Sequence, residues 1–204
     1  MPVRAVAFDI GGVLEEVAPP DQWLGSWQRR LGMSADGFEA ALAGVDPGGL
    51  ITTGGLSEAK IRQRYADALG LPEAAAQEFM ADLWDWYCGE LDEDLTAFAA
   101  SLRPGCATAI LSNSADGARR EEQARYAFAD LFDVIVYSHE VRLAKPDPQI
   151  YQLLCAELDV APAELVFLDD VPENVEAALD LGIRGILHHS TPESISAIGS
   201  LLTS

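Results

Sequence analysis

Polar side chains follow several short apolar runs of the sequence, at the point where each run ends. Asp9 follows the first run, Ser112 and Asn113 follow another, and the pair Asp169 and Asp170 follows a later one. A single Asp in such a place is more often a helix cap, and a Ser-Asn pair is more often part of a turn. Gathered around one crevice, however, three carboxylates, a hydroxyl and an amide make a candidate reactive site.

A divalent cation is the chemistry that such a group of carboxylates indicates. Carboxylates that lie close together resist joint ionisation unless a cation sits between them. Mg²⁺ fits, since one or two carboxylates, a carbonyl, waters and a substrate phosphate complete its octahedron. Gly11 and Gly12 allow the backbone to approach a ligand closely and offer amide donors to an anion.

Lys145 is the candidate cation of the protein itself. The chain has eleven Arg and only two Lys, so a lysine is unusual here. Lys145 lies in a loop stiffened by Pro146 and Pro148, and the second proline suits the first turn of a helix. An exposed loop cation is the ordinary interpretation of such a residue, but the scarcity of lysine favours a functional role.

The elements that must position these residues indicate an α/β fold. Residues 3–8 form a β-branched and apolar run that predicts a buried strand. After residue 92, predicted strands at 108–111, 134–137, 165–168 and 185–187 alternate with predicted helices at 95–102, 115–127, 148–158 and 173–181. This alternation predicts a parallel sheet covered on both faces. Ligands of such sheets bind at the carboxyl ends of the strands, where the polar residues stand.

The intervening segment has helical periodicity throughout. Helices are predicted near 22–31, 35–43, 57–69 and 73–88, separated by a glycine-rich stretch at 47–55. The pairs Trp23 with Trp27 and Trp84 with Trp86 are expected to pack inside this unit rather than to stack on a substrate. We therefore predict a Rossmann-like, doubly wound parallel sheet formed by residues 1–14 and 93–204, with an inserted all-helical cap of residues 15–92.

Composition excludes several classes of partner. The formal net charge of −20 would repel nucleic acid and anionic lipid. The three cysteines are far apart and have no metal-ligand spacing, which favours a reducing compartment. The apolar start is too short for a signal sequence, and no apolar stretch approaches the ~18 residues of a membrane helix. We expect a cytoplasmic protein, a monomer or a homodimer, whose partner is a small molecule.

Four ordered segments of the chain resemble the motifs of the haloacid dehalogenase-like hydrolase superfamily. They are Phe8-Asp9-Ile10-Gly11-Gly12-Val13-Leu14, Leu111-Ser112-Asn113, Ala144-Lys145-Pro146-Asp147-Pro148-Gln149-Ile150-Tyr151, and Phe167-Leu168-Asp169-Asp170-Val171-Pro172-Glu173-Asn174. The resemblance spans the predicted core, and the order and spacing of the motifs are specific. The helical insertion is similar to the small cap domain of the family, which covers the site and selects substrates.

The resemblance implies a role for each matched residue. Asp9 would be a nucleophile that forms an aspartyl-phosphate, and Ser112 and Lys145 would hold the transferring phosphoryl group. Mg²⁺ would be bound by Asp9, the backbone carbonyl of Gly11 and Asp170, with Asp169 binding a metal water or serving as a further ligand. The amides of Gly11 and Gly12 and the side chain of Asn113 would contribute to substrate binding, with Asn174 as a further candidate. The expected function is Mg²⁺-dependent hydrolysis of a small phosphorylated metabolite, a sugar phosphate or similar.

Gly11 is a departure from the family pattern that keeps two alternatives open. Phosphatases of this family usually carry a second Asp two residues after the nucleophile, as acid and base, although a subset is similar to this chain in having Gly there. One alternative is a 2-haloacid dehalogenase, which uses the same Asp on carbon without a metal. Its pattern has an aromatic residue where Gly11 stands, a Thr where Val13 stands, and no acid pair. The other alternative is a non-catalytic protein that binds a phosphate ester without turnover.

Overall fold

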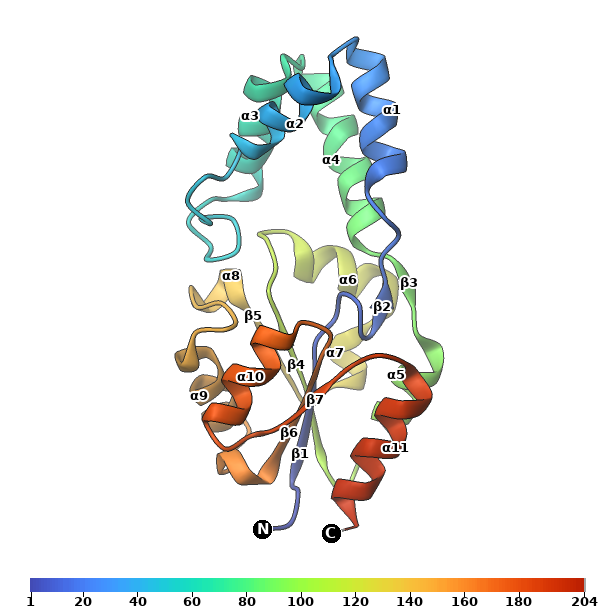
Figure 1. Cartoon of the computed structure of the whole chain (residues 1–204), viewed down its shortest axis with the longest axis vertical. Helices are drawn as coiled ribbons and strands as arrows, with labels where there is room; N and C mark the ends of the chain where they lie inside the picture. The colour runs from blue at the N-terminus through green and yellow to red at the C-terminus, as the bar shows by residue number, and fades with distance from the viewer. Residues whose placement is uncertain (204) are drawn as a thin grey trace.

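A five-stranded parallel sheet forms the centre of the lower lobe in a computed structural model that describes residues 1–203 (Figure 1). Its strand order is β5-β4-β1-β6-β7. The strands are β1 (Ala5–Phe8), β4 (Ala107–Ser112), β5 (Val134–Tyr137), β6 (Leu165–Asp169) and β7 (Arg184–Leu187). Each predicted strand of the sheet is therefore present. The first strand of the sequence lies at the centre, with β4 and β6 as its neighbours.

Helices cover both faces of the sheet, as the alternating pattern predicts. Val6 and Phe8 pack against α5 (Glu93–Ser101), α6 (Ala118–Tyr126), α7 (Phe128–Leu131) and α11 (Thr191–Leu202). Ala5 and Ala7 face the opposite way, toward α9 (Pro148–Glu157) and α10 (Pro172–Asp180). Both sets are buried, which explains why β1 is apolar throughout. The predicted fold class, a Rossmann-like α/β sheet, is confirmed, whereas α7, α11, α8 (Ser138–Val141) and the 3₁₀ helix Pro162–Glu164 were not predicted.

Four helices form the upper lobe (Figure 1), namely α1 (Asp21–Leu31), α2 (Ala35–Ala43), α3 (Glu58–Leu69) and α4 (Glu73–Tyr87). They enclose a core of their own, in which Trp23 and Trp27 each place their ring centroid 5.2 Å from that of Phe79. A two-stranded antiparallel pair that was not predicted, β2 (Glu15–Glu16) with β3 (Glu90–Leu91), joins this lobe to the sheet. The division into residues 1–14, 15–92 and 93–204 stays a prediction.

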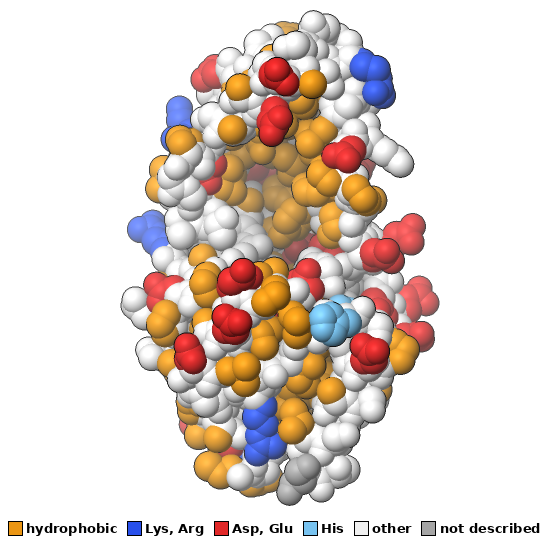
Figure 2. Space-filling view, viewed as in Figure 1, with side chains coloured by type: hydrophobic (Ala, Val, Ile, Leu, Met, Phe, Trp, Pro, Cys, Tyr) orange, Lys and Arg blue, Asp and Glu red, His pale blue; other side chains and the backbone are white. Residues whose placement is uncertain are grey.

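The two lobes also touch away from the β2 and β3 pair. The carboxylate of Glu58 forms a bidentate contact of 2.8 and 2.9 Å with Arg120 of α6, and its backbone N–H donates to Asp116 at 2.7 Å. The Ser138 hydroxyl donates to the Thr52 carbonyl at 2.7 Å. These contacts hold the upper lobe across the carboxyl ends of the strands, and Figure 2 shows the hollow that is left between the lobes.

Two further features concern the described chain as a whole. Cys88, Cys106 and Cys155 are buried and form no disulfide. No helix within residues 1–203 is long and apolar enough to cross a membrane.

Candidate active site

Asp9 stands directly after the central strand β1, between the ends of β4 and β6. Its backbone N–H donates to the Leu168 carbonyl at 2.9 Å, which continues the pairing with β6 beyond the strand. Its carboxylate Oδ1 accepts from the backbone N–H of Ile10 at 2.8 Å and lies 2.7 Å from Lys145 Nζ. Within the described residues, the second oxygen, Oδ2, accepts no hydrogen bond. Asp9 therefore has one anchored oxygen and one that is free to react or to bind a cation.

Lys145 is buried at the centre of the site and is not an exposed loop cation. Its Nζ lies 2.7 Å from Asp9 Oδ1 and 2.7 Å from Asp169 Oδ2, and its side chain is 1% exposed. The side chain of Asn113 fixes the backbone of Lys145 in both directions, accepting from its N–H at 2.8 Å and donating to its carbonyl at 2.9 Å. Two of the predicted motifs are thus joined through Asn113, and the ammonium group is aimed between two carboxylates.

Asp169 and Asp170 differ in how their oxygens are used. Both oxygens of Asp169 are occupied, because Oδ1 accepts from Val171 N–H at 2.8 Å, Oδ2 bonds Lys145, and the Asn174 amide donates to both at 3.1 Å. Asp169 is completely buried, whereas Asp170 is exposed and its carboxylate makes no hydrogen bond to another side chain of the described residues. Asp170 is therefore the carboxylate of the pair with free lone pairs, and Asp169 holds Lys145 and Asn174 in place.

The three carboxylates are close enough to share a cation. One oxygen each from Asp9, Asp169 and Asp170 can be chosen so that all three lie within 4.8 Å of one another. Burial raises the pKa of Asp9 to about 6, with the charge of Asp169 adding to the rise and Lys145 opposing it. Burial, together with Asp169, also raises the pKa of Asp170. Lys145 offsets only part of the negative charge, so the donor set fits a hard divalent ion.

Gly11 and Gly12 differ in whether their positions could accommodate a side chain. Gly12 has a φ of 75°, and a Cβ there would lie 2.4 Å from Oδ2 of Asp170. Any side chain at Gly12 would therefore displace Asp170 as well as strain the backbone. Gly11 has no heavy atom within 4 Å of the position that a Cβ would take. The space beside Gly11 is open, and no steric constraint explains the absence of a side chain there.

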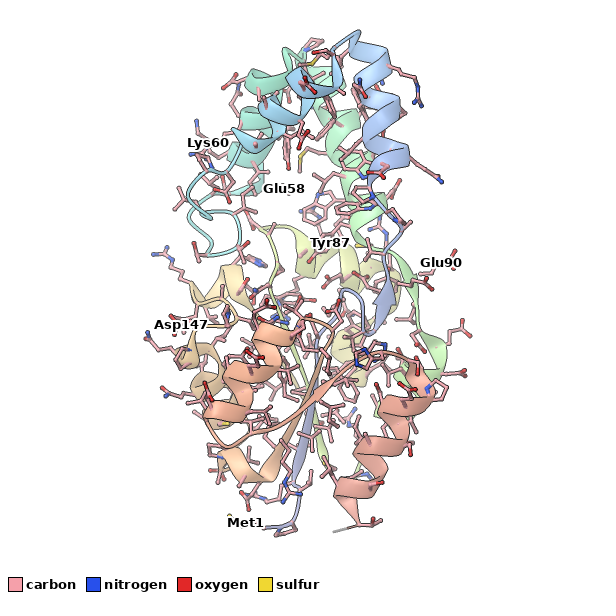
Figure 3. All side chains as sticks on the ribbon, viewed as in Figure 1. Met1, Glu58, Lys60, Tyr87, Glu90 and Asp147 are labelled. Carbon is pink, nitrogen blue, oxygen red and sulfur yellow. The ribbon has the colours of Figure 1, made fainter. Side chains whose placement is uncertain are left out.

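A cleft of about 300 Å³ brings most of the predicted site residues together, although Gly12 and Asp169 do not line it, and its wall includes residues of the upper lobe that were not predicted. Ser112, the last residue of β4, is 2% exposed and lines this cleft. From the other lobe, Trp86 and Tyr87 at the end of α4 form its opposite wall, and Figure 3 shows Tyr87 between the lobes. Trp86 packs against Trp23 as expected, with ring centroids 5.7 Å apart, and it also lines the cleft because α4 ends over the carboxyl edge of the sheet. The cleft is lined by Asp9, Gly11, Glu15, Val17, Trp86, Tyr87, Ser112, Asn113, Lys145, Asp170, Val171 and Asn174.

Glu15 is a buried acid in the wall of the same cleft. It belongs to β2, is 2% exposed, and its Oε2 has no hydrogen-bond partner in the described part of the chain. Burial raises the pKa of Glu15 to about 7. Glu16, its neighbour on β2, is exposed. The sequence contains no sign of this burial, since two consecutive glutamates indicate a solvated segment; the β2 and β3 pairing turns one of them inward.

A second buried acid, Glu122 on α6, makes the stability of the chain depend on pH. It is completely buried, its Oε2 accepts from Tyr137, and burial raises its pKa to about 8. An unfolded glutamate loses its proton near pH 4.5, so the folded chain binds more protons between pH 4.5 and 8. The stabilising contribution is therefore full below pH 4.5 and is lost as the pH rises toward 8.

We expect the melting temperature in EDTA to fall on the order of 10 °C between pH 5 and 8.5, and Glu122→Gln to remove much of this fall. Calorimetry of both proteins across this range is the measurement. Glu157→Gln, which changes an exposed glutamate on α9, is the matched control and should retain the wild-type pH dependence. An equal fall in Glu122→Gln and wild type would contradict the assignment to Glu122.

Comparison with known proteins identifies the family. Residues 3–182 match the family model described as haloacid dehalogenase-like hydrolase. A solved structure of the HAD family enzyme bt-2542 from Bacteroides thetaiotaomicron, in complex with magnesium and inorganic phosphate, superposes with a TM-score of 0.79 at 19% identity, covering 92% of this chain and 94% of that one. At this identity the likeness shows the fold.

Several curated relatives catalyse different reactions. The chain is 30% identical over 215 residues to bifunctional epoxide hydrolase 2 of Sus scrofa, covering 96% of this chain but only 38% of that protein. It is 30% identical over 166 residues to phosphoserine phosphatase of Thermus thermophilus, covering 78% and 66% of the two chains. It is 29% identical over 189 residues to (S)-2-haloacid dehalogenase 1 of Pseudomonas sp., covering 91% and 73%. The match to the family model over residues 3–182 shows that the chain belongs to the haloacid dehalogenase-like hydrolase family.

Proposed function

We propose that this hydrolase is a Mg²⁺-dependent phosphatase of small phosphorylated metabolites, a sugar phosphate or a similar monoester. One observation carries the proposal: Lys145 Nζ lies 2.7 Å from both Asp9 and Asp169, while Asp170 completes a group of three carboxylates within 4.8 Å. A buried ammonium beside a carboxylate with one free oxygen suits a reaction in which a phosphoryl dianion must be drawn close to a nucleophilic anion.

In this proposal each residue of the site has its own role in the reaction. Oδ2 of Asp9 attacks phosphorus, and the P–O bond to the ester's alcohol breaks, so that the alcohol departs and an aspartyl-phosphate remains. Water then attacks this phosphorus, which restores the Asp9 carboxylate and releases inorganic phosphate. Lys145 and the Ser112 hydroxyl hold the phosphoryl oxygens, and the amide of Gly11 donates to the same anion. The predicted role of the Gly12 amide is corrected, because its N–H already donates to the Glu15 carbonyl at 2.8 Å. Asp9, Asp170 and the carbonyl of Gly11 would hold Mg²⁺, with Asp169 beside them. The metal supplies charge neutralisation at the phosphoryl oxygens when it is bound.

The dehalogenase alternative shares Asp9 but leaves part of the site without a use. A haloacid carries a single negative charge, so the site would need no divalent ion, and Asp170 would remain beside Asp9 and Asp169 without a role in the reaction. The second alternative, a protein that binds phosphate esters without turnover, requires that no acid replace the one absent at Gly11. Glu15 in the wall of the cleft argues against it.

The proposal also covers the cellular compartment, the oligomeric state and the partners of the enzyme. A net charge of −20 and the buried free thiols are in keeping with a cytoplasmic enzyme that acts on a free small molecule, as a monomer or a homodimer. Nucleic acid and membranes are not its proposed partners.

Removal of the metal is the experiment that tests the proposal. A panel of phosphate monoesters should be hydrolysed with Mg²⁺, and EDTA should abolish turnover, because Asp9, Asp169 and Asp170 together repel a dianion. 2-Chloropropionate with and without Mg²⁺ is the parallel assay for the dehalogenase. Phosphatase activity that persists in chelator, or chloride release that needs no metal, would overturn the proposal.

A further inference from the structure

A second pocket adjoins the active-site cleft on the side of the upper lobe. It has a volume of about 210 Å³ and shares Trp86, Tyr87 and Asn113 with the cleft. Its walls come from the loop before α3, from α3 and α4, and from the segment after β4, so it lies where the two lobes meet. A group attached to a phosphate held by Lys145 and Ser112 would therefore lie next to this pocket.

The walls of this pocket are mostly apolar. Figure 2 shows hydrophobic side chains gathered around the hollow between the lobes. No Arg, Lys, His, Asp or Glu is among the lining residues, all of which belong to the described chain. The lining consists of Ile51, Thr52, Ile61, Tyr65, Met80, Leu83, Trp84, Trp86, Tyr87, Asn113, Ser114 and Ala115.

The polar side-chain groups of the lining are largely engaged within the protein. Asn113 is used at both ends by the backbone of Lys145, and the Ser114 hydroxyl bonds His139 Nδ1 at 2.8 Å. The indole N–H of Trp84 donates to Glu58 at 2.8 Å, and that of Trp86 donates to the Ala18 carbonyl at 2.7 Å. Only the hydroxyls of Thr52 and Tyr65 are left for a ligand, because the Tyr87 hydroxyl interacts with the carboxylate of Glu122.

An apolar lining whose polar groups are mostly engaged favours some leaving groups over others. A sugar would bring more hydroxyls than the two that remain can satisfy, and each buried unpaired hydroxyl costs binding free energy. The ammonium and carboxylate of an amino acid ester would meet no opposite charge. A hydrocarbon group, by contrast, would contact the aromatic and aliphatic walls and leave the engaged polar groups undisturbed.

The volume sets the size of that group. Cavities of about 150 Å³ lined by aliphatic and aromatic side chains bind benzene, so about 210 Å³ admits one aromatic ring with a small substituent or an alkyl chain of comparable bulk. We propose that this pocket receives the organic part of the substrate, and that the enzyme prefers phosphate monoesters of an uncharged, apolar alcohol or phenol of about this size. The inference rests on the proposed phosphatase function and narrows it away from sugar phosphates.

The test is a series of linear alkyl phosphates with Mg²⁺, from methyl through butyl to hexyl, compared with glucose 6-phosphate. The leaving-group pKa is nearly constant along the longer alcohols, so the series measures contact with the pocket. We expect kcat/KM to rise on the order of 10²- to 10³-fold from methyl to hexyl phosphate, and glucose 6-phosphate to fall well below hexyl phosphate. A flat series, or a preference for glucose 6-phosphate, would overturn the inference and leave the phosphatase function standing.

Variants at two neighbouring positions test whether the preference for longer alkyl phosphates arises in this pocket. Ile51 lines the pocket, whereas Leu50 in the same loop is 41% exposed and does not. Ile51→Gln should lower the ratio of hexyl to methyl phosphate in kcat/KM by about tenfold, and Leu50→Gln should leave the ratio at its wild-type value. Equal ratios in both variants would remove Ile51 from the binding surface and contradict the assignment.

A binding measurement separates this inference from the proposed function. Trp84 and Trp86 line the pocket, so hexan-1-ol should change the tryptophan fluorescence of the wild type saturably, and glycerol should not. The affinity should weaken in Ile51→Gln and persist in Leu50→Gln. If no phosphate ester is hydrolysed, the proposed function fails, and the hexan-1-ol titration alone then decides: saturable binding supports the apolar pocket, and its absence overturns it.

Discussion

Replacing Asp9 with Asn is expected to abolish turnover of every phosphate ester while leaving the chain folded. The amide of Asn lacks the nucleophilic oxygen pair of a carboxylate, so no aspartyl-phosphate can form, and kcat should fall by at least about 10⁴-fold. The site loses one of two ion pairs of Lys145, which keeps its 2.7 Å contact with Asp169. We therefore expect a loss of about 1–3 kcal/mol in the free energy of unfolding, not a failure to fold.

Two measurements are needed for this variant. Initial rates with hexyl phosphate and Mg²⁺ give the loss of turnover, and mass spectrometry of acid-quenched wild-type enzyme should detect a phosphorylated species that Asp9→Asn does not form. Asp180→Asn, which alters an exposed carboxylate at the end of α10, is the matched control and should keep wild-type rates. A phosphorylated Asp9→Asn protein would move the nucleophile to another residue.

The sheet and its reactive edge are predictable from the sequence because they follow from burial. The strand β1 is apolar at every position since helices cover both of its faces, and this run ends at Asp9. Parallel strands bring their carboxyl ends to one edge, which is why Asp9, Ser112 and Asp169 meet. The scarcity of lysine singled out Lys145, and the resemblance to a family added the order of the motifs and the phosphoryl-binding role of this residue.

The contacts inside the site are not predictable in the same way. That Asp169 is fully hydrogen-bonded while Asp170 is free depends on the turn that places Val171 N–H and the Asn174 amide against one carboxylate. Neighbouring identical residues carry no sign of that difference in the sequence. Asn113, a weak candidate from its type alone, proves to hold the backbone of Lys145 on both sides.

The contribution of the upper lobe to the cleft cannot be predicted from the sequence, because it depends on how the elements are oriented. Periodicity places helices, but it does not give the angle at which α4 ends over the sheet, so Trp86 and Tyr87 could not be placed in the cleft. The two-residue strands β2 and β3 are too short for an alternating pattern to be recognised. Their pairing decides that Glu15 is buried and Glu16 is exposed, and this choice bears directly on the acid that Gly11 lacks.

Glu15→Gln is expected to slow the hydrolysis of alkyl phosphates on the order of 10²- to 10⁴-fold and to leave aryl phosphates nearly unchanged. An alkoxide leaves poorly unless it is protonated, whereas a phenolate departs without help. Glu15 is the hypothesised donor because it lines the cleft with Asp9, is 2% exposed, and has an Oε2 without a hydrogen-bond partner in residues 1–203. The wild type should then show little dependence on the leaving group.

The measurement is kcat/KM across a leaving-group series for the wild type, Glu15→Gln and Glu16→Gln, the last of which changes the exposed neighbour on β2. Glu16→Gln should match the wild type. A steep series in the wild type that Glu15→Gln leaves unaltered would show that no residue protonates the leaving group and that Glu15 is only a buried wall of the cleft.

Substitution of Gly11 tests whether Glu15→Gln loses activity because a proton donor is missing or because the structure is damaged. A Cβ at Gly11 would meet no heavy atom within 4 Å, so Gly11→Asp should fold and place a new acid two residues after the nucleophile. In the Glu15→Gln background it should restore alkyl phosphate hydrolysis by at least tenfold without accelerating aryl phosphates, because only the alkyl esters need a proton donor. Equal acceleration of both ester classes, or none in either, would mean that proton donation does not limit the reaction, and the account of Glu15 would then fail with it.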